Sequence, residues 1–334
     1  TEDLCDRAIA DIRDQQQANT GRPFFAYLAL GAAHAPLHAP KPFIDKYRGR
    51  FDKGWDQVRA ETYERQKALG IIPKEAATVS EILKQYGYST GAFGKWHVTP
   101  AHEQSLTGPF DRWPTGLGFE RFYGILSAEA SQFEPPMFDQ TTPVMPYEGR
   151  DDYHMSEDIT QKAIEWMKLQ RSSNPNRPFF TYLATGAMHC PHHVAPEWSE
   201  RFRGAFDQGW DKLREEIYER QLKAGVIPPG TALTSRPDPV PAWEEYPDRY
   251  KPVASRLMEV FAGFLAHTDA QIGRVLDAVD RLGLDDNTMI LFLTGDNGAS
   301  AEGTVHGAWS APAFQNGIAE DPEWLLAHMD DFGT

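Results

Sequence analysis

The chain contains one segment twice, and this internal repeat limits the architectures that are open to it. Residues 1–73 align without a gap on residues 156–228, and nearly half of the aligned positions are identical. Two copies separated by a long unique stretch do not make a solenoid, which needs about three adjacent units or more. Two explanations stay open at this stage, namely an old tandem duplication and a chimera that carries one module twice.

Each copy of the repeat has the pattern of a helix, a strand and a second helix. The strand of the second copy is the aromatic run 179–184, which follows Pro178 and is bounded by turn residues, as is typical of a buried strand. His189 follows this strand, and His34 is its counterpart in the first copy. The clearest matches pair 22–29 with 177–184, 32–36 with 187–191, 51–56 with 206–211, and 70–73 with 225–228.

The rest of the chain alternates helical and strand patterns. A capping box at Thr78 and Glu81 predicts the start of a helix, and the spacing of apolar residues over 257–282 predicts a long amphipathic one. The apolar runs 88–93 and 289–293 predict further strands. This alternation predicts an α/β fold with a mostly parallel sheet flanked by helices.

Composition excludes several classes of protein. Asp and Glu number 48 against 33 Lys and Arg, a formal net charge of −15, which argues against a nucleic-acid binder. The chain holds no run of about 20 apolar residues, so we expect no membrane span. Cys5 and Cys190 are too few for a disulfide framework. No secretory signal opens the sequence, and we expect a soluble protein of the bacterial cytoplasm or periplasm.

Three of the expected strands end in residues that can do chemistry. Lys95 and His97 follow the first strand, and His189 follows the second. Asp296 and Asn297 follow the third. Because ligands of parallel α/β sheets bind beyond the carboxyl ends of the strands, the sequence predicts that these residues converge on one active site.

Each pair of residues has a functional and a plain structural interpretation. Asp296 and Asn297 offer the oxygen ligands that Ca²⁺ or Mg²⁺ prefers, although Asp-Asn-Gly is also a common turn. In an extended chain Lys95 and His97 would point to one side, where they would offer a positive charge and a proton. Taken alone, this pair would better fit an exposed lysine and a histidine with a structural hydrogen bond.

The histidines of residues 189–193 could suggest a transition-metal site. His189, His192 and His193 are close in the sequence. We argue against the site, because no cysteine or carboxylate is placed nearby to complete a tetrahedral ligand set.

Together these motifs resemble the sulfatase family, in particular bacterial arylsulfatases of the alkaline-phosphatase-like superfamily. The resemblance runs from about residue 76 to the end of the chain. Five motifs stand in the family's order: 91–97, 113–124, 178–191 with 209–211, 286–298, and 301–303 with 309–317.

The resemblance implies a role for each candidate residue. Lys95 would hold the sulfate of a small-molecule or glycan sulfate ester, and His97 would hydrogen-bond the catalytic nucleophile. His189 would protonate the leaving oxygen as a general acid. Asp296 and Asn297 would bind the divalent cation, Ca²⁺ or Mg²⁺. The nucleophile of the family is a formylglycine.

The sequence also departs from the family pattern. The paired N-terminal aspartates and the Cys/Ser-x-Pro-Ser-Arg motif that yields formylglycine do not occur, and the repeat stands in their place. We therefore expect residues 1–75 to be a duplicate of 156–230, and 76–334 to be a partial catalytic domain, incomplete at both ends. A splice near Pro73 would explain this arrangement.

Two other functions stay open beside a sulfatase-type hydrolase. An inactive fragment or anion-binding remnant would fit the missing nucleophile motif. A phosphatase or phosphodiesterase of the same superfamily would share the displacement at a tetrahedral anion. The oligomeric state is not predicted from the sequence.

Overall fold

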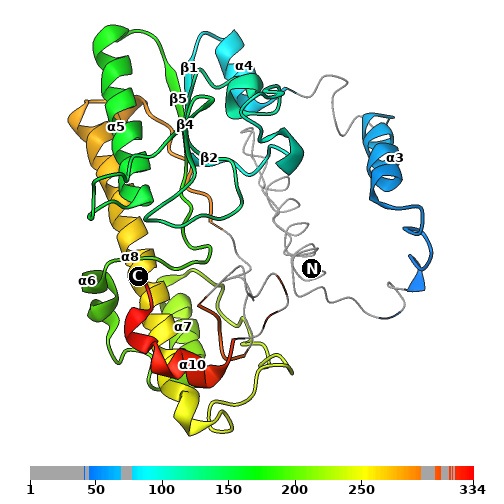
Figure 1. The fold of residues 1–334 in the computed structure, drawn as a ribbon, viewed down its shortest axis with the longest axis vertical. Helices are drawn as coiled ribbons and strands as arrows, with labels where there is room; N and C mark the ends of the chain where they lie inside the picture. The colour runs from blue at the N-terminus through cyan, green and yellow to red at the C-terminus, as the bar shows by residue number, and fades with distance from the viewer. Residues whose placement is uncertain are drawn as a thin grey trace. The chain divides into compact units, whose positions relative to one another are not determined.

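The computed structural model describes residues 41, 45–68, 77–294, 305–309, 316, 318 and 320–334 (Figure 1). The chain divides into two compact units. The smaller unit is Thr1–Ala76 with Met289–Ala301, and the larger is Ala77–Thr288 with Glu302–Thr334.

The smaller unit contains the helix α3 (Trp55–Ala68). Its counterpart in the second copy of the repeat is α7 (Gly209–Ala224) in the larger unit. Both copies therefore form a helix that begins at the shared Gly-Trp-Asp motif. In the second copy the Asp211 carboxylate accepts a hydrogen bond from the Trp243 amide at 2.8 Å and another from Arg236 at 2.8 Å. These bonds tie the start of α7 to the segment that follows it.

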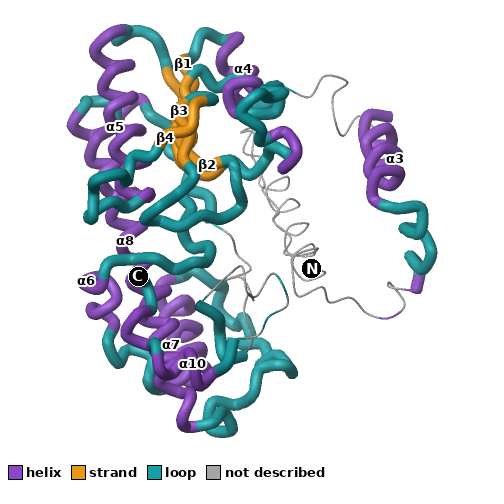
Figure 2. The backbone as a smooth tube through the Cα atoms, in the orientation of Figure 1, coloured by secondary structure: helices purple, strands orange, loops and turns teal. Residues whose placement is uncertain are grey.

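A five-stranded sheet organises the larger unit (Figure 2). The strand order is β4-β3-β2-β1-β5. β1 lies parallel to both β2 and β5, whereas β3 runs antiparallel to β2 and β4. The α/β prediction is thus confirmed, and a hairpin makes the sheet mixed at one edge. The strands are β1 (Ser89–Lys95), β2 (Arg121–Ile125), β3 (Met137–Asp139), β4 (Thr142–Val144) and β5 (Phe179–Ala184).

Helices complete the larger unit. α5 packs against β1, β2 and β5, and α8 packs against α5. Besides α7, the α-helices are α4 (Val79–Gln85), α5 (Met155–Ser173), α6 (Pro196–Ser199), α8 (Lys251–Arg281) and α10 (Pro322–Ala327). Single 3₁₀ turns cover Ala101–Glu103, Pro114–Leu117, Glu200–Phe202, Asp248–Tyr250, Asp285–Asn287 and Met329–Asp331.

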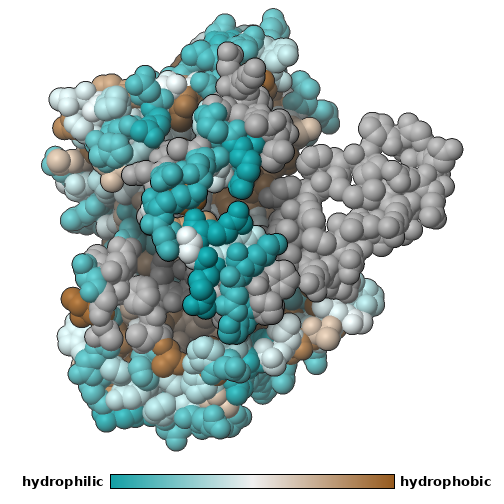
Figure 3. Space-filling model, turned by 90° about the vertical axis from the view of Figure 1, so that its right-hand side faces the viewer, coloured by the Kyte–Doolittle hydropathy of each residue, from teal (hydrophilic) through white to brown (hydrophobic). Residues whose placement is uncertain are grey.

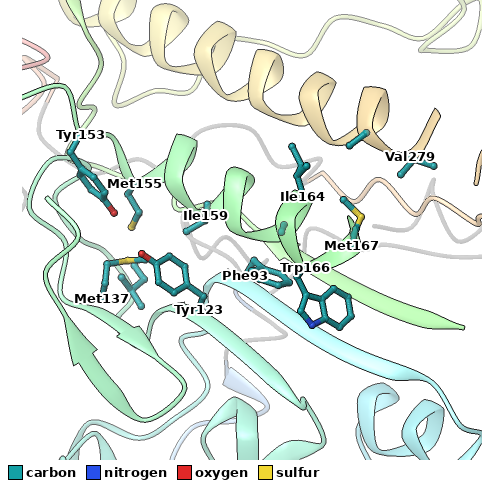
Figure 4. Packing of buried hydrophobic residues seen from close by; sticks show 13 residues of the cluster. Phe93, Tyr123, Met137, Tyr153, Met155, Ile159, Ile164, Trp166, Met167 and Val279 are labelled. Atoms are coloured by element: carbon teal, nitrogen blue, oxygen red, sulfur yellow. The ribbon is translucent and has the colours of Figure 1, made fainter. Parts of the chain in front are cut away.

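The sheet buries a different cluster on each face. Because neighbouring residues of a strand point to opposite faces, Phe93 joins the cluster with α5 and α8, while Ala92 joins the cluster around Trp113. Figure 4 shows the first cluster, in which Phe93 lies beside Trp166 of α5, with their ring centroids 5.8 Å apart. Both clusters fix β1 in place, and β1 ends at the candidate site.

Several predicted elements are confirmed. Thr78 Oγ1 accepts a hydrogen bond from the Glu81 amide, and the Glu81 carboxylate accepts one from the Thr78 amide at 2.6 Å, so the capping box at α4 is present. β1, β5 and α8 lie where their patterns predicted them.

The strand predicted over residues 289–293 is wrong. These residues form no strand, and Met289 and Leu293 are 85% and 81% exposed. A strand needs a neighbouring strand for its backbone hydrogen bonds, and none of the described strands pairs with this segment. An apolar run alone could not supply that partner.

The described surface is that of a polar protein. Among the described residues on the face in Figure 3, hydrophilic side chains predominate and hydrophobic ones are scattered. Within the described ranges, no helix combines the length and the apolar character that a membrane crossing requires.

Candidate active site

A close approach of three strands leads into the candidate site. Gly94 has a φ of +108° and pairs in register with Gly124 of β2 and Ala184 of β5. A Cβ at Gly94 would overlap the Ala184 carbonyl, and one at Gly124 would overlap the Gly94 carbonyl. Glycine is therefore required at both positions, and this tight packing fixes the backbone that carries Lys95.

Lys95 is the last residue of β1, and the chain turns soon after it. The Trp96 amide donates to the Ile125 carbonyl at 2.9 Å, which holds the strand end against β2. His97 has a φ of +50°, so the extended path assumed from the sequence does not continue through it. Lys95 and His97 nevertheless lie close enough to interact electrostatically.

The pKa of His97 shows which charges surround it. Partial burial lowers this pKa most, and the positive charges of Lys95 and then His189 lower it further. The structure thus brings together the three residues predicted from the ends of β1 and β5. The electrostatic result is a His97 imidazole whose pKa is lowered beside Lys95 and His189.

His189 lies in the loop that follows β5. Its Nδ1 lies 2.9 Å from the Cys190 carbonyl oxygen. Because a carbonyl only accepts, Nδ1 carries a proton in this hydrogen bond. The same Nδ1 lies 3.5 Å from Glu129 Oε2.

Glu129 is the site residue that sequence analysis missed. It lies four residues beyond the end of β2, which is parallel to β1, so it reaches the same edge of the sheet as Lys95 and His189. A carboxylate just after a parallel strand is the signal that could have identified it.

A hydrogen-bond network holds the loop that carries Glu129. The Ser127 hydroxyl donates to the Glu129 carbonyl at 2.8 Å. The backbone amide of Gln132 donates to Nδ1 of His193 at 3.4 Å, and the backbone carbonyl of Gln132 accepts from the Met155 backbone amide at 2.7 Å. This loop is thus attached both to the His189 loop and to the start of α5.

Two histidines in this network, the buried His154 and the half-buried His193, have strongly lowered pKa values and are neutral at pH 7. Burial is the largest cause that lowers the pKa of His154 to about 4, and the charge of His267 adds to it. Burial also lowers the pKa of His193 to about 4, with a further contribution from His192. His154 Nδ1 accepts from the Ser156 amide at 3.2 Å, and its Nε2 donates to the His193 carbonyl at 3.1 Å.

The other predicted residues lie outside the described residues. These are the predicted cation ligands Asp296 and Asn297, together with Cys5 and the repeat's His34. Among the described residues, one group could hold a metal ion, and it consists of Glu129, His189 and Cys190.

Comparison with known protein families identifies the family of the chain. A family model described as Sulfatase matches residues 1–70 and residues 59–321, which together cover most of the chain. The chain belongs to the sulfatase family. The resemblance read from the motifs is therefore confirmed at the level of the family.

Two relatives illustrate the similarity of this sulfatase-family chain. An uncharacterised sulfatase of Schizosaccharomyces pombe is 30% identical over 275 residues, which are 77% of this chain and 45% of the relative. The arylsulfatase of Klebsiella aerogenes is 29% identical over 238 residues, which are 69% of this chain and 48% of the enzyme. The chain spans about half the length of these curated relatives.

Solved structures give a weaker match. BT4656 in complex with its substrate D-glucosamine-2-N,6-O-disulfate aligns with a TM-score of 0.37 and 19% identity, over 63% of this chain and 47% of that one. Ps i-CgsB in complex with a neocarrahexaose aligns with a TM-score of 0.40 and 18% identity, over 64% and 39%.

Proposed function

We propose that this chain binds sulfate esters at the carboxyl edge of β1, β2 and β5 and takes part in their hydrolysis. Membership of the sulfatase family supports the reaction class. The observation that carries the proposal is the convergence of Lys95 and His97, from the end of β1, with His189, from the loop after the paired strand β5. A sulfate group is the kind of anion that such a cluster would bind.

Each residue has a distinct task in this proposal. The Lys95 ammonium pairs with a sulfate oxygen and offsets its negative charge. His189, protonated at both nitrogens, donates its Nε2 proton to the leaving oxygen as the sulfur–oxygen bond breaks, and Nδ1–H stays on the Cys190 carbonyl. His97, whose pKa is lowered by burial and by its neighbours, can accept a hydrogen bond from the nucleophile.

We further propose that Asp296 and Asn297 are ligands of a divalent cation, Ca²⁺ or Mg²⁺. The fit rests on donor chemistry, because a carboxylate and an amide oxygen suit both ions. When bound, such a cation polarises the sulfate and the nucleophile. No residue of this chain is assigned as the nucleophile, because the formylglycine motif is missing from the sequence.

The first copy of the repeat enters the proposal as a duplicate, with 1–75 copied from 156–230 and 76–334 forming the partial catalytic domain. Its support is the family model, which matches 1–70 separately from 59–321. The same helix in each copy agrees with this division. Sequencing the source gene across codons 60–90 tests it, since an unbroken native junction in independent clones would remove the splice near Pro73.

The function is tested by hydrolysis and binding of p-nitrophenyl sulfate with added Ca²⁺. We expect Lys95→Ala and His189→Ala to weaken binding, to abolish any turnover, or both. The exposed Lys168 of α5 provides the matched control Lys168→Ala, which should behave as the parent chain does. Binding that is lost in the site variants without turnover in the parent would identify an anion-binding remnant. Binding or turnover unaffected by both site variants would overturn the proposed site.

A further inference from the structure

We propose that Glu129, His189 and Cys190 form a binding site for Zn²⁺. The three side chains come from the loops after β2 and β5. Their ligand atoms all lie within 4.8 Å of one another. The sequence argued against a transition-metal site at residues 189–193 for want of a cysteine or carboxylate to complete the ligand set. The structure instead groups Cys190 with His189 and supplies the carboxylate from Glu129.

The distances fit a tetrahedral ion. His189 Nδ1 lies 3.5 Å from Glu129 Oε2 and 3.6 Å from Cys190 Sγ. Zinc bonds of about 2.0 Å to nitrogen or oxygen and 2.3 Å to sulfur place tetrahedral ligands roughly 3.3–3.6 Å apart. These two separations match that range, and the third, between the Glu129 carboxylate and Cys190 Sγ, lies within 4.8 Å.

The donor set selects the class of metal. A thiolate, an imidazole and a carboxylate together suit Zn²⁺, whereas Ca²⁺ and Mg²⁺ prefer oxygen ligands alone. The site is thus chemically different from the oxygen donors Asp296 and Asn297. Three protein ligands leave a fourth tetrahedral position for water or a substrate oxygen.

The loops that hold the ligands are already ordered by hydrogen bonds. Ser127 supports the backbone of Glu129, and the His193 ring stacks on Phe133 with their centroids 5.0 Å apart. Since His193 also accepts from the Gln132 amide, the two ligand-bearing loops are joined beside the site. Such support lowers the conformational free energy that is lost when the ligands are brought together around the ion.

A cysteine–histidine–carboxylate relay does not fit the same atoms. Glu129 Oε2 and Cys190 Sγ both approach Nδ1 of His189. A relay needs the carboxylate on one ring nitrogen and the nucleophile on the other. Convergence on one nitrogen is instead what three ligands around a single ion require.

Binding has a defined proton balance. Zn²⁺ takes the Nδ1 lone pair, so the neutral His189 ring moves its proton to Nε2 and gives up its hydrogen bond to the Cys190 carbonyl. The Cys190 thiol loses its proton to solvent and becomes a thiolate. One consequence rests on the proposed function. If His189 is the general acid of hydrolysis, Zn²⁺ inhibits the reaction, because the metal-bound ring cannot become an imidazolium.

The test measures metal binding directly and is independent of turnover. The purified full chain is titrated with Zn²⁺ against a chromophoric chelator, and with Co²⁺ while the absorbance is followed. We expect one equivalent of Zn²⁺ that depends on Cys190, and a thiolate-to-cobalt charge-transfer band. Cys190→Ala and Glu129→Gln should each weaken the affinity by more than about tenfold, since even supporting residues of a metal site cost that much.

Cys5→Ala is the matched control and should keep the affinity for Zn²⁺. Zn²⁺ should also slow alkylation of Cys190 by iodoacetamide in the unmodified chain, which needs no variant to fold, and Ca²⁺ should not. An unchanged affinity in Cys190→Ala, or alkylation of Cys190 at the same rate with Zn²⁺, would overturn the site. Neither result would bear on whether Lys95 and His189 bind sulfate esters.

Discussion

At the scale of single residues, His97 is the most direct reporter of the candidate site. Its pKa is lowered by burial first and by the charges of Lys95 and His189 next. Lys95→Gln removes one of these positive charges and keeps a side chain of similar length. We therefore expect the pKa of His97 to rise in this variant.

The measurement is an NMR titration of the histidine ring carbons in the full chain, with His97 assigned from a His97→Gln sample. Lys168→Gln is the matched control, because it removes a lysine charge from the exposed side of α5. The pKa of His97 should stay at the parent value there. An unchanged pKa in Lys95→Gln would mean that Lys95 does not face His97 in solution.

At the scale of elements, the close contact of β1, β2 and β5 determines where the site residues lie. Gly94 combines a positive φ with a backbone contact that leaves no room for a Cβ. We expect Gly94→Ala to lower the free energy of unfolding by about 3 kcal/mol, since backbone strain and overpacking each cost roughly 1–3 kcal/mol. Urea denaturation followed by circular dichroism measures the change.

Gly87 provides the control for the strain alone. It also has a positive φ, of +86°, but a Cβ there would meet nothing within 4 Å. Gly87→Ala should cost only about 1–2 kcal/mol. Equal costs for the two variants would contradict the close strand contact as the cause.

The same strands show which site residues could be predicted from the sequence alone. Lys95 and His189 were predictable because each follows a strand with a strong local pattern, and the carboxyl ends of parallel strands share one edge. Glu129 was not predictable, since its approach to His189 is set by strand pairing between distant segments. The strand prediction for residues 289–293 was wrong because an apolar run does not indicate whether another strand is available to pair with it.

At the scale of the whole molecule, the pH dependence of stability involves two neutral histidines, the buried His154 and the half-buried His193. His154 and His193 each have a folded pKa of about 4, below the ordinary value of 6.5. Between these values the unfolded chain binds more protons than the folded one, so stability is full above pH 6.5 and is lost as the pH falls towards 4. Each histidine accounts for about 3 kcal/mol of that loss.

This acid sensitivity is measurable as the slope of the unfolding free energy against pH. We expect a steep fall from pH 6.5 downwards in the parent chain, and a shallower one in His154→Gln and in His193→Gln, whatever stability each variant has at neutral pH. His102→Gln removes an exposed imidazole and sets the reference slope.

Carboxylates add their own loss of stability near and below their ordinary pKa of about 4, so the slopes are compared above that pH. Parent-like slopes in both buried-histidine variants would show that these rings are not the groups that take up the protons. The loops they join carry Glu129, His189 and Cys190, so the same protonation should also weaken the hydrogen bonds that hold the candidate site, because a protonated His193 Nδ1 can no longer accept from the Gln132 amide.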